Sequence, residues 1–302
     1  MPECQTSRRS FLSILPGLAA SGLFRSPGET VLDCHQHSLY NGRAHEELIA
    51  HQAANRIGMT LVMPGGGPLT GELGTNEDCF YLVSAHPEKF VRFASCDPAD
   101  PRSVSVLTEH IRSGALGIGA MKYRIAVDAP EMRRVYDVAR ELRLPVHLHF
   151  QGRIFNEGIE RLEPLLKAYS GARFICHGPT WWAHISARVD PDSSYPRDAV
   201  RPGGLADRLL SDYENVYGDL SAQSGLNALT RDPDFAYGFL GKQARKLIWG
   251  SDCECRDGKG GGTANRYCTA TRSLSMLAEL TPDKTTFRRI VYDNGAALLK
   301  LK

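Results

Sequence analysis

The chain has 302 residues, of which 42% are hydrophobic and 23% are charged. This length can bury a large core, and single α/β barrels commonly have this size. The formal net charge is +2, and no basic stripe interleaved with aromatic residues is present, so a nucleic-acid partner is not indicated. No segment after the N-terminus is long and apolar enough to span a membrane.

The N-terminal segment has the pattern of a twin-arginine export signal. Arg8 and Arg9 precede a moderately apolar run that ends near Phe24 and carries small residues at 19–21. The run is too short for a spanning helix, and an ordinary basic N-terminus is the alternative. We assign residues 1–27 to the signal and residues 28–302 to one domain. We expect export to the periplasm or another extracytoplasmic location, with no membrane anchor after signal removal.

The chain has eight cysteines, of which Cys4 would leave with the signal. The seven that remain are an odd number, which is a poor disulfide framework. We therefore interpret them mostly as small core residues.

Short apolar segments alternate with helical patterns along the rest of the chain. The expected strands are 31–37, 59–63, 90–96, 115–123, 145–150, 172–177, 216–221 and 246–251. The expected helices are 44–57, 76–86, 104–113, 131–142, 157–169, 205–211, a segment within 226–245, 271–280 and 285–299. A long Pro-rich stretch, 179–204, interrupts the rhythm. Eight alternations favour a single (β/α)8 TIM barrel over a doubly wound open sheet, because no G-x-G-x-x-G follows the first strand.

The first strand carries two histidines one residue apart. Residues two apart on a strand point to the same face, so Asp33, His35 and His37 would share one side. Chemistry in such barrels lies where the strands end. Other expected strand ends carry Lys122, His147 with His149, His177, and Asp252. Histidine and aspartate are ligand types that zinc prefers, so the pattern predicts a metal site at this face.

Six segments of the chain together resemble the amidohydrolase superfamily. The similarity is greatest to its amidohydrolase-related (Amidohydrolase 2) branch of metal-dependent barrel hydrolases and decarboxylases. The matching segments are VLDCHQH (31–37), LPVHLH (144–149), FICHG (174–178), VYGDLS (216–221), IWGSD (248–252) and IVYDNGA (290–296). The resemblance covers essentially the whole chain after the signal and implies a metallo-dependent hydrolase barrel. It does not specify a substrate.

The resemblance implies that His35, His37, His149 and Asp252 hold a divalent metal, with His177 beside the bound water. One Zn²⁺ is favoured, and Mn²⁺ or a binuclear site are the alternatives. A catalytic zinc keeps an open position for water and lowers the pKa of that water to about 7. Asp252 would take the proton of the water and pass it to the leaving group.

Lys122 has two interpretations. In two-metal relatives a lysine on the fourth strand is carboxylated and bridges the ions, and the histidine of the sixth strand binds the second ion. The alternative, which we favour, is that Lys122 binds a substrate carboxylate.

Residues next to the predicted ligands are expected to support the site or to pack. His147 lies two residues deeper than His149, so we expect a buried, hydrogen-bonded histidine. Asp33 is expected to orient the ligands from beneath. Cys253 and Cys255 flank Asp252, and packing is favoured over metal binding for both.

Three residues that follow strands are candidates for substrate contact. Arg124 and Arg153 could clamp a carboxylate, or lie on a solvated rim. Trp181, followed by Trp182, lies in the Pro-rich stretch and is expected either to stack on substrate or to pack internally.

Two enzymatic functions remain open. The first is a hydrolase that attacks an amide, ester or lactone carbonyl of a small, carboxylated substrate. The second is a lyase on the same scaffold, a non-oxidative decarboxylase or hydratase. A non-catalytic binding protein is disfavoured by the complete ligand set. The sequence leaves the substrate and the oligomeric state open, and a homo-oligomer is compatible with it.

Overall fold

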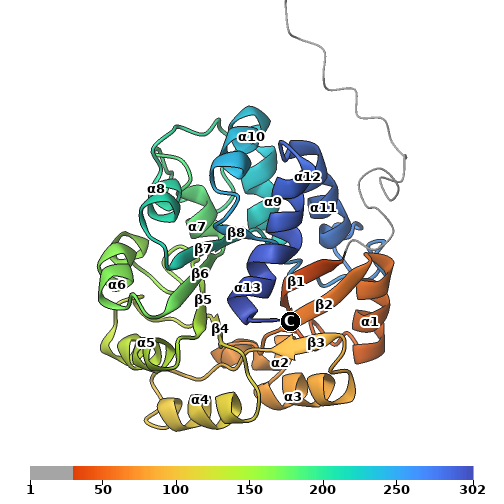
Figure 1. The fold of residues 1–302 in the computed structure, drawn as a ribbon, viewed down its shortest axis with the longest axis vertical. Coiled ribbons are helices and arrows are strands. Elements are labelled where there is room, and N and C mark those ends of the chain that lie inside the picture. Colours follow the sequence, from red (N-terminus) through yellow and green to blue (C-terminus); the bar gives the residue numbers. More distant parts are fainter. Residues whose placement is uncertain (1–29, 302) are drawn as a thin grey trace, which may run out of the picture.

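The computed structural model describes residues 30–301, which contain eight short parallel strands alternating with helices (Figure 1). The strands are β1 (Val31–Gln36), β2 (Ile57–Val62), β3 (Phe90–Arg92), β4 (Ile118–Met121), β5 (Pro145–His149), β6 (Arg173–His177), β7 (Val216–Asp219) and β8 (Leu247–Ile248). Most of their residues are buried. Such apolar strands are typical of a parallel sheet covered by helices.

The strands pair in two sheets, in the orders β1-β2-β3 and β4-β5-β6-β7-β8. Backbone contacts cross both seams between these sheets. At one seam, Ala94, just after β3, forms an isolated parallel bridge with Ile118 of β4. At the other, the Cys34 amide of β1 donates to the Trp249 carbonyl after β8, at 3.1 Å. The α/β fold is confirmed, with the strand order of a (β/α)8 barrel whose strands pair as two sheets.

Helices cover the outside of the strands (Figure 1). Helix α5 illustrates the pattern, because it buries Met132, Val135, Tyr136 and Ala139, which recur at helical spacing. The helices are α1 (His45–Ala54), α2 (Thr70–Leu73), α3 (Asn76–Ala85), α4 (Ser103–Arg112), α5 (Pro130–Leu142), α6 (Leu162–Ala168), α7 (Pro179–Ala183), α8 (Leu205–Asp212), α9 (Ala222–Thr230), α10 (Pro233–Lys242), α11 (Thr269–Leu280), α12 (Lys284–Arg288) and α13 (Asn294–Leu299).

The structure divides one expected helical segment, 226–245, into α9 and α10. The break lies at Asp232 and Pro233. The Asp232 side chain accepts a hydrogen bond from the Phe235 amide at 3.1 Å, and Pro233 occupies the first turn. An aspartate cap followed by proline starts a new helix, because proline has no amide to donate to the preceding turn.

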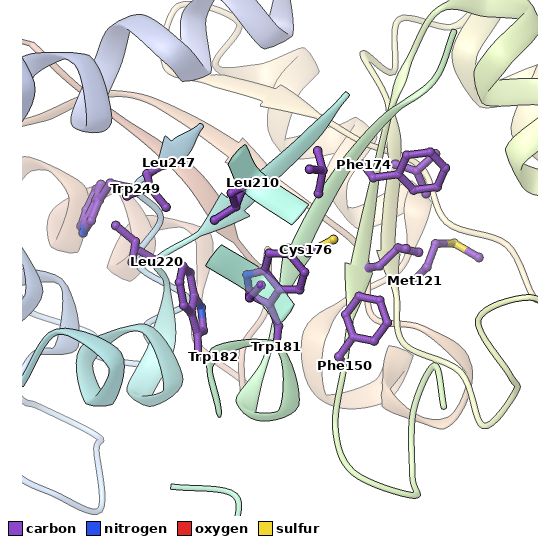
Figure 2. Packing of buried hydrophobic residues seen from close by; sticks show 14 of the residues in the cluster. Met121, Phe150, Phe174, Cys176, Trp181, Trp182, Leu210, Leu220, Leu247 and Trp249 are labelled. Carbon is purple, nitrogen blue, oxygen red and sulfur yellow. The ribbon is translucent and has the colours of Figure 1, made fainter. Parts of the chain in front are cut away.

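The two tryptophans of the Pro-rich stretch belong to the core. Trp181 is 0% exposed and stacks with Phe150, with ring centroids 6.4 Å apart. Trp182 donates from Nε1 to the Asp219 carbonyl at 2.8 Å. Figure 2 shows both indoles between Phe150 and Leu220. This placement corrects the expectation that Trp181 stacks on substrate: packing against the strands removes it from solvent.

The seven described cysteines are all free and buried. No helix among residues 30–301 has the length and apolar character needed to cross a membrane. The expected twin-arginine segment lies outside the described residues.

Candidate metal centre

Two strand ends bring imidazole nitrogens around a carboxylate at a third. The Nε2 atoms of His35 and His37, from β1, lie 3.7 Å and 3.6 Å from the two oxygens of Asp252. The Nε2 atom of His177, at the end of β6, lies 3.6 Å from Asp252 Oδ2. These separations exceed hydrogen-bond lengths. The ligand atoms of His35, His177 and Asp252 all lie within 4.8 Å of one another, close enough to share one ion.

The backbone after β8 is turned to present Asp252 to these histidines. Asp252 has a φ of 40°, and its amide donates to the His35 carbonyl at 2.8 Å. The buried Asp33 carboxylate accepts from the Ser251 amide at 2.7 Å and from the Ser251 hydroxyl at 2.6 Å. It also accepts from Gln52 Nε2 at 3.0 Å. Asp33 therefore fixes the segment between β8 and Asp252, and its contact with Gln52 places it toward α1.

The second ring nitrogens of His35 and His37 are held by acceptors. His37 Nδ1 donates to the Met63 carbonyl at 2.8 Å, and His35 Nδ1 donates to Asp219 Oδ2 at 2.6 Å. A neutral imidazole that donates from Nδ1 has a bare lone pair on Nε2. Both Nε2 atoms therefore face Asp252 in the form that binds a metal.

Asp219, at the end of β7, organises the base of the site. Besides His35, it accepts from His147 Nε2 at 2.9 Å and from the Ser221 hydroxyl at 2.9 Å. Burial alone would raise the pKa of Asp219, but the neighbouring His35 ring and the hydrogen bonds from His147 and His35 outweigh burial and hold that pKa well below its usual value. No role was predicted for Asp219, although it lies in the VYGDLS segment.

His147 is fully buried against Asp219, as its position two residues below His149 suggested. Burial lowers the pKa of His147 to about 4. The ring is therefore neutral near pH 7.

The orientation of His177 follows from its contact with Ser221. The Ser221 hydroxyl has one hydrogen, which it donates to Asp219, so its oxygen accepts from His177 Nδ1 at 3.0 Å. This leaves the Nε2 lone pair of His177 facing Asp252, like those of His35 and His37. His177 can thus act either as a ligand or as a hydrogen-bonding neighbour of a bound water.

His149 points differently from the other three histidines. Its Nε2 donates to Gln151 Oε1 at 3.0 Å, and its ring centroid lies 5.1 Å from that of His177. Burial, with the neighbouring positive charge of Lys122, holds the pKa of His149 well below its usual value, so the ring is neutral. Metal binding through this nitrogen requires His149 to release Gln151.

Two adjoining cavities open above the site, with volumes of about 270 and 150 Å³. Both are lined by Tyr40, Lys122, His149 and Asp252. Lys122 follows β4, and its Nζ lies 5.3 Å from the centre of the Phe155 ring. Burial lowers the pKa of Lys122, an effect that the charge of Asp252 opposes. Lys122 therefore borders the substrate space. Tyr40 is a further wall residue, and no sequence pattern marks it.

The two arginines expected to clamp a carboxylate lie elsewhere. Arg124 and Arg153 line a separate cavity of about 300 Å³ together with Ile125, Ile154 and Glu157. The structure brings them together, but not with the histidines or Asp252. Cys253 and Cys255 are likewise outside the lining of the two site cavities.

Solved structures similar in fold include barrel enzymes of the amidohydrolase type. A probable 2-pyrone-4,6-dicarboxylic acid hydrolase from Acinetobacter baumannii, with citric acid bound, has a TM-score of 0.62 at 15% identity, covering 90% of this chain and all of that chain. An uncharacterised TIM-barrel protein from Bordetella bronchiseptica has a TM-score of 0.65 at 13% identity, covering 90% of this chain and 98% of the other. At sequence identities of 13% and 15%, this structural similarity shows a shared fold.

A third similar structure contains a metal. It is a 5-carboxyvanillate decarboxylase from Novosphingobium aromaticivorans, complexed with manganese and 4-hydroxy-3-methoxy-5-nitrobenzoic acid. Its TM-score is 0.58 at 12% identity, covering 91% of this chain and 97% of that chain. No protein-family model and no curated protein matches the sequence. The three similar structures share the α/β barrel fold of this chain.

Proposed function

We propose that the chain is a metal-dependent enzyme of the amidohydrolase type, and that it hydrolyses a small carboxylated substrate. The observation that carries this proposal is the convergence of three bare imidazole nitrogens, those of His35, His37 and His177, on Asp252. Imidazoles whose other nitrogen is hydrogen-bonded, grouped around a carboxylate, are typical of divalent metal sites. Metal analysis of the purified protein tests this directly.

The residues present fit a divalent ion. His35, His37 and Asp252 supply three ligands, and His149 is our candidate for the fourth, after release of Gln151. Neutral imidazoles and a carboxylate suit Zn²⁺, the metal we propose, and they also suit Mn²⁺, which the similar decarboxylase structure contains. Such an ion lowers the pKa of a coordinated water and polarises a substrate carbonyl.

The chain's own groups have distinct tasks in this proposal. Asp252 accepts a proton from the attacking water and delivers it to the leaving group. His177, fixed by Ser221, donates to or accepts from the reacting oxygen. Lys122 binds a substrate carboxylate at the rim of the two cavities. The names of the two similar enzymes, a pyrone dicarboxylic acid hydrolase and a carboxyvanillate decarboxylase, support a carboxylated substrate.

Decarboxylation is the second candidate function, and the similar decarboxylase structure supports it. A panel of carboxylated lactones, esters, amides and aromatic acids separates the two reactions. Hydrolysis gives a new carboxyl group and retains every carbon atom, whereas decarboxylation alone releases carbon dioxide. We expect a new acid without carbon dioxide, and carbon dioxide release would replace the hydrolase proposal by the lyase.

We expect the candidate centre to hold one ion, independent of Lys122. The Lys122→Ala protein should keep the full metal content of the unaltered protein, because the amine is proposed to bind substrate rather than metal. His35→Ala should lose one equivalent per chain, measured by inductively coupled plasma mass spectrometry. The result that would contradict this is a loss of two equivalents of metal in His35→Ala and of one equivalent in Lys122→Ala. It would establish that Lys122 is carboxylated and bridges two ions.

We also propose export by the twin-arginine route, on the basis of Arg8 and Arg9 before the apolar run. Replacing both arginines by lysine keeps the charge but removes the pair that the export machinery recognises. A tagged variant should therefore accumulate in the cytoplasm, measured by cell fractionation against the unaltered chain. Export at the normal level would show that the segment is an ordinary basic N-terminus.

A further inference from the structure

A second cluster of metal-ligand atoms lies outside the candidate metal centre. It consists of His51 on α1, Cys253 immediately after Asp252, and Cys268 just before α11. All three residues are buried, and their ligand atoms lie within 4.8 Å of one another. We propose that this cluster binds a structural zinc ion, separate from the metal of the candidate centre.

The distances within the cluster match the edges of a zinc tetrahedron. The sulfurs of Cys253 and Cys268 are 3.8 Å apart, and His51 Nε2 lies 3.3 Å from the Cys268 sulfur. With Zn–S bonds of about 2.3 Å and Zn–N bonds of about 2.0 Å, a tetrahedron has S···S edges of about 3.8 Å and S···N edges of about 3.5 Å. Both of these separations are close to the edges expected for ligands of one ion, and the third, between His51 and Cys253, is within 4.8 Å.

His51 is held in the form that ligates metal. Its Nδ1 donates to Gln52 Oε1 at 2.9 Å. The Gln52 amide cannot turn round, because its nitrogen donates to Asp33 at 3.0 Å and to Thr60 at 2.7 Å. In its neutral form the ring therefore directs the Nε2 lone pair toward Cys268, as metal-binding histidines do.

A buried arginine supplies charge compensation for thiolates. Arg43 is 0% exposed, and its guanidinium donates to four neutral oxygens, two of which are the carbonyls of Cys253 and Cys255 at 2.7 and 3.1 Å. Within residues 30–301 no carboxylate forms an ion pair with it. A buried cation without a counter-charge is costly. A zinc ion with three thiolates and one imidazole has a net charge of −1, which would balance Arg43.

This charge balance assigns Cys255 as the fourth ligand. Cys255 is buried and lies two residues after Cys253, but its sulfur is outside the group of ligand atoms within 4.8 Å, so its side chain must turn toward the ion on binding. The Cys255 sulfur contacts Asp257 at 3.3 Å and accepts from the Gly260 amide at 3.1 Å. Zinc binding replaces the contact with Asp257 and releases the three thiol protons to solvent.

The zinc would fix one wall of the substrate space. Residues 253 and 268 are the two ends of a Gly-rich segment that supplies Glu254, Thr263, Asn265 and Tyr267 to the larger cavity. The ion would join both ends of this segment to α1, directly beside Asp252. Its role is therefore to hold the wall and the end of β8 in place.

Zinc release tests the proposal on the unaltered full-length protein, purified without reductant or chelator. An organomercurial that modifies thiols should release one zinc per chain, followed with a chromogenic zinc indicator. Cys268→Ser should lack this equivalent. Cys96→Ser is the matched control, because Cys96 is a buried thiol after β3 that lies outside the cluster. We expect it to keep the full amount.

Cobalt substitution separates this site from the candidate metal centre, whose proposed ligands include no sulfur. Cobalt-loaded protein should show thiolate-to-cobalt charge-transfer absorption in the near ultraviolet. His35→Ala should retain this absorption, and Cys268→Ser should lose it. A Cys253–Cys268 disulfide found by mass spectrometry would overturn the proposal. The proposal would also be overturned if the unaltered protein has free thiols, releases no zinc and lacks this absorption. These measurements on the unaltered protein do not depend on the folding of any variant.

Discussion

The His177→Asn protein is expected to fold, to keep its metal and to lose turnover by about 10²–10⁴-fold. The imidazole is held by Ser221 with Nε2 facing Asp252, which places it beside the reacting oxygen. Asparagine has a polar group of similar reach, but it cannot exchange a proton near neutral pH. The apparent substrate affinity should therefore change less than kcat. Steady-state kinetics measures the two quantities separately.

The metal content of the same variant decides the ligand set. The His35→Ala control should lose metal and activity together, because it removes a ligand. Loss of metal from His177→Asn would make His177 the fourth ligand, and would leave His149 bound to Gln151. Full activity of His177→Asn would remove this residue from the mechanism.

The sequence predicted the parts of the site that depend on strand periodicity. His35 and His37 both face Asp252, and His177 reaches the same place, because parallel strands in a barrel end at a common face. Asp33 was expected on the same side, but it contacts Gln52 of α1, and the pairing of β1 with β2 shifts register between Asp33 and Gln36. The alternation of apolar segments with helical patterns predicted the α/β fold for the same local reason.

The sequence could not predict contacts that join distant segments. The role of Asp219 depends on His35, which lies 184 positions away, and no local pattern marks that contact. Whether Trp181 faces the cavity or the core depends on how α7 packs against Phe150. The cluster of His51 with Cys268 likewise joins residues 217 apart, so the cysteine count alone suggested only packing.

The Asp219→Asn protein is expected to bind its metal about 10–100-fold more weakly, as is usual when the partner of a ligating histidine is altered. The carboxylate accepts on both oxygens. Oδ2 receives His35, His147 and Ser221, and Oδ1 receives the Ser221 amide at 3.0 Å. An amide has only one accepting atom, so either orientation sets its NH₂ group against at least one of these donors.

This conflict should also reduce stability, because the donors are buried. We expect the free energy of unfolding to fall by about 1–3 kcal/mol, the typical cost of leaving a buried polar group without its partner. Chelator competition measures the metal affinity, and urea unfolding of the metal-free protein measures stability separately. Asp128→Asn is the control. It breaks a partly exposed ion pair with Arg161, 3.0 Å long, and should leave metal affinity unchanged.

The two measurements together assign the role of Asp219. If metal affinity falls while Asp128→Asn binds normally, the carboxylate holds the lone pair of His35 toward the ion. If stability falls and metal affinity does not, Asp219 is only a structural acceptor beneath the site. Within the described residues, Asp219 and Ser221 are the residues that contact His35 Nδ1. If Asp219 does not orient the ring, its orientation must come from the position of His35 on β1.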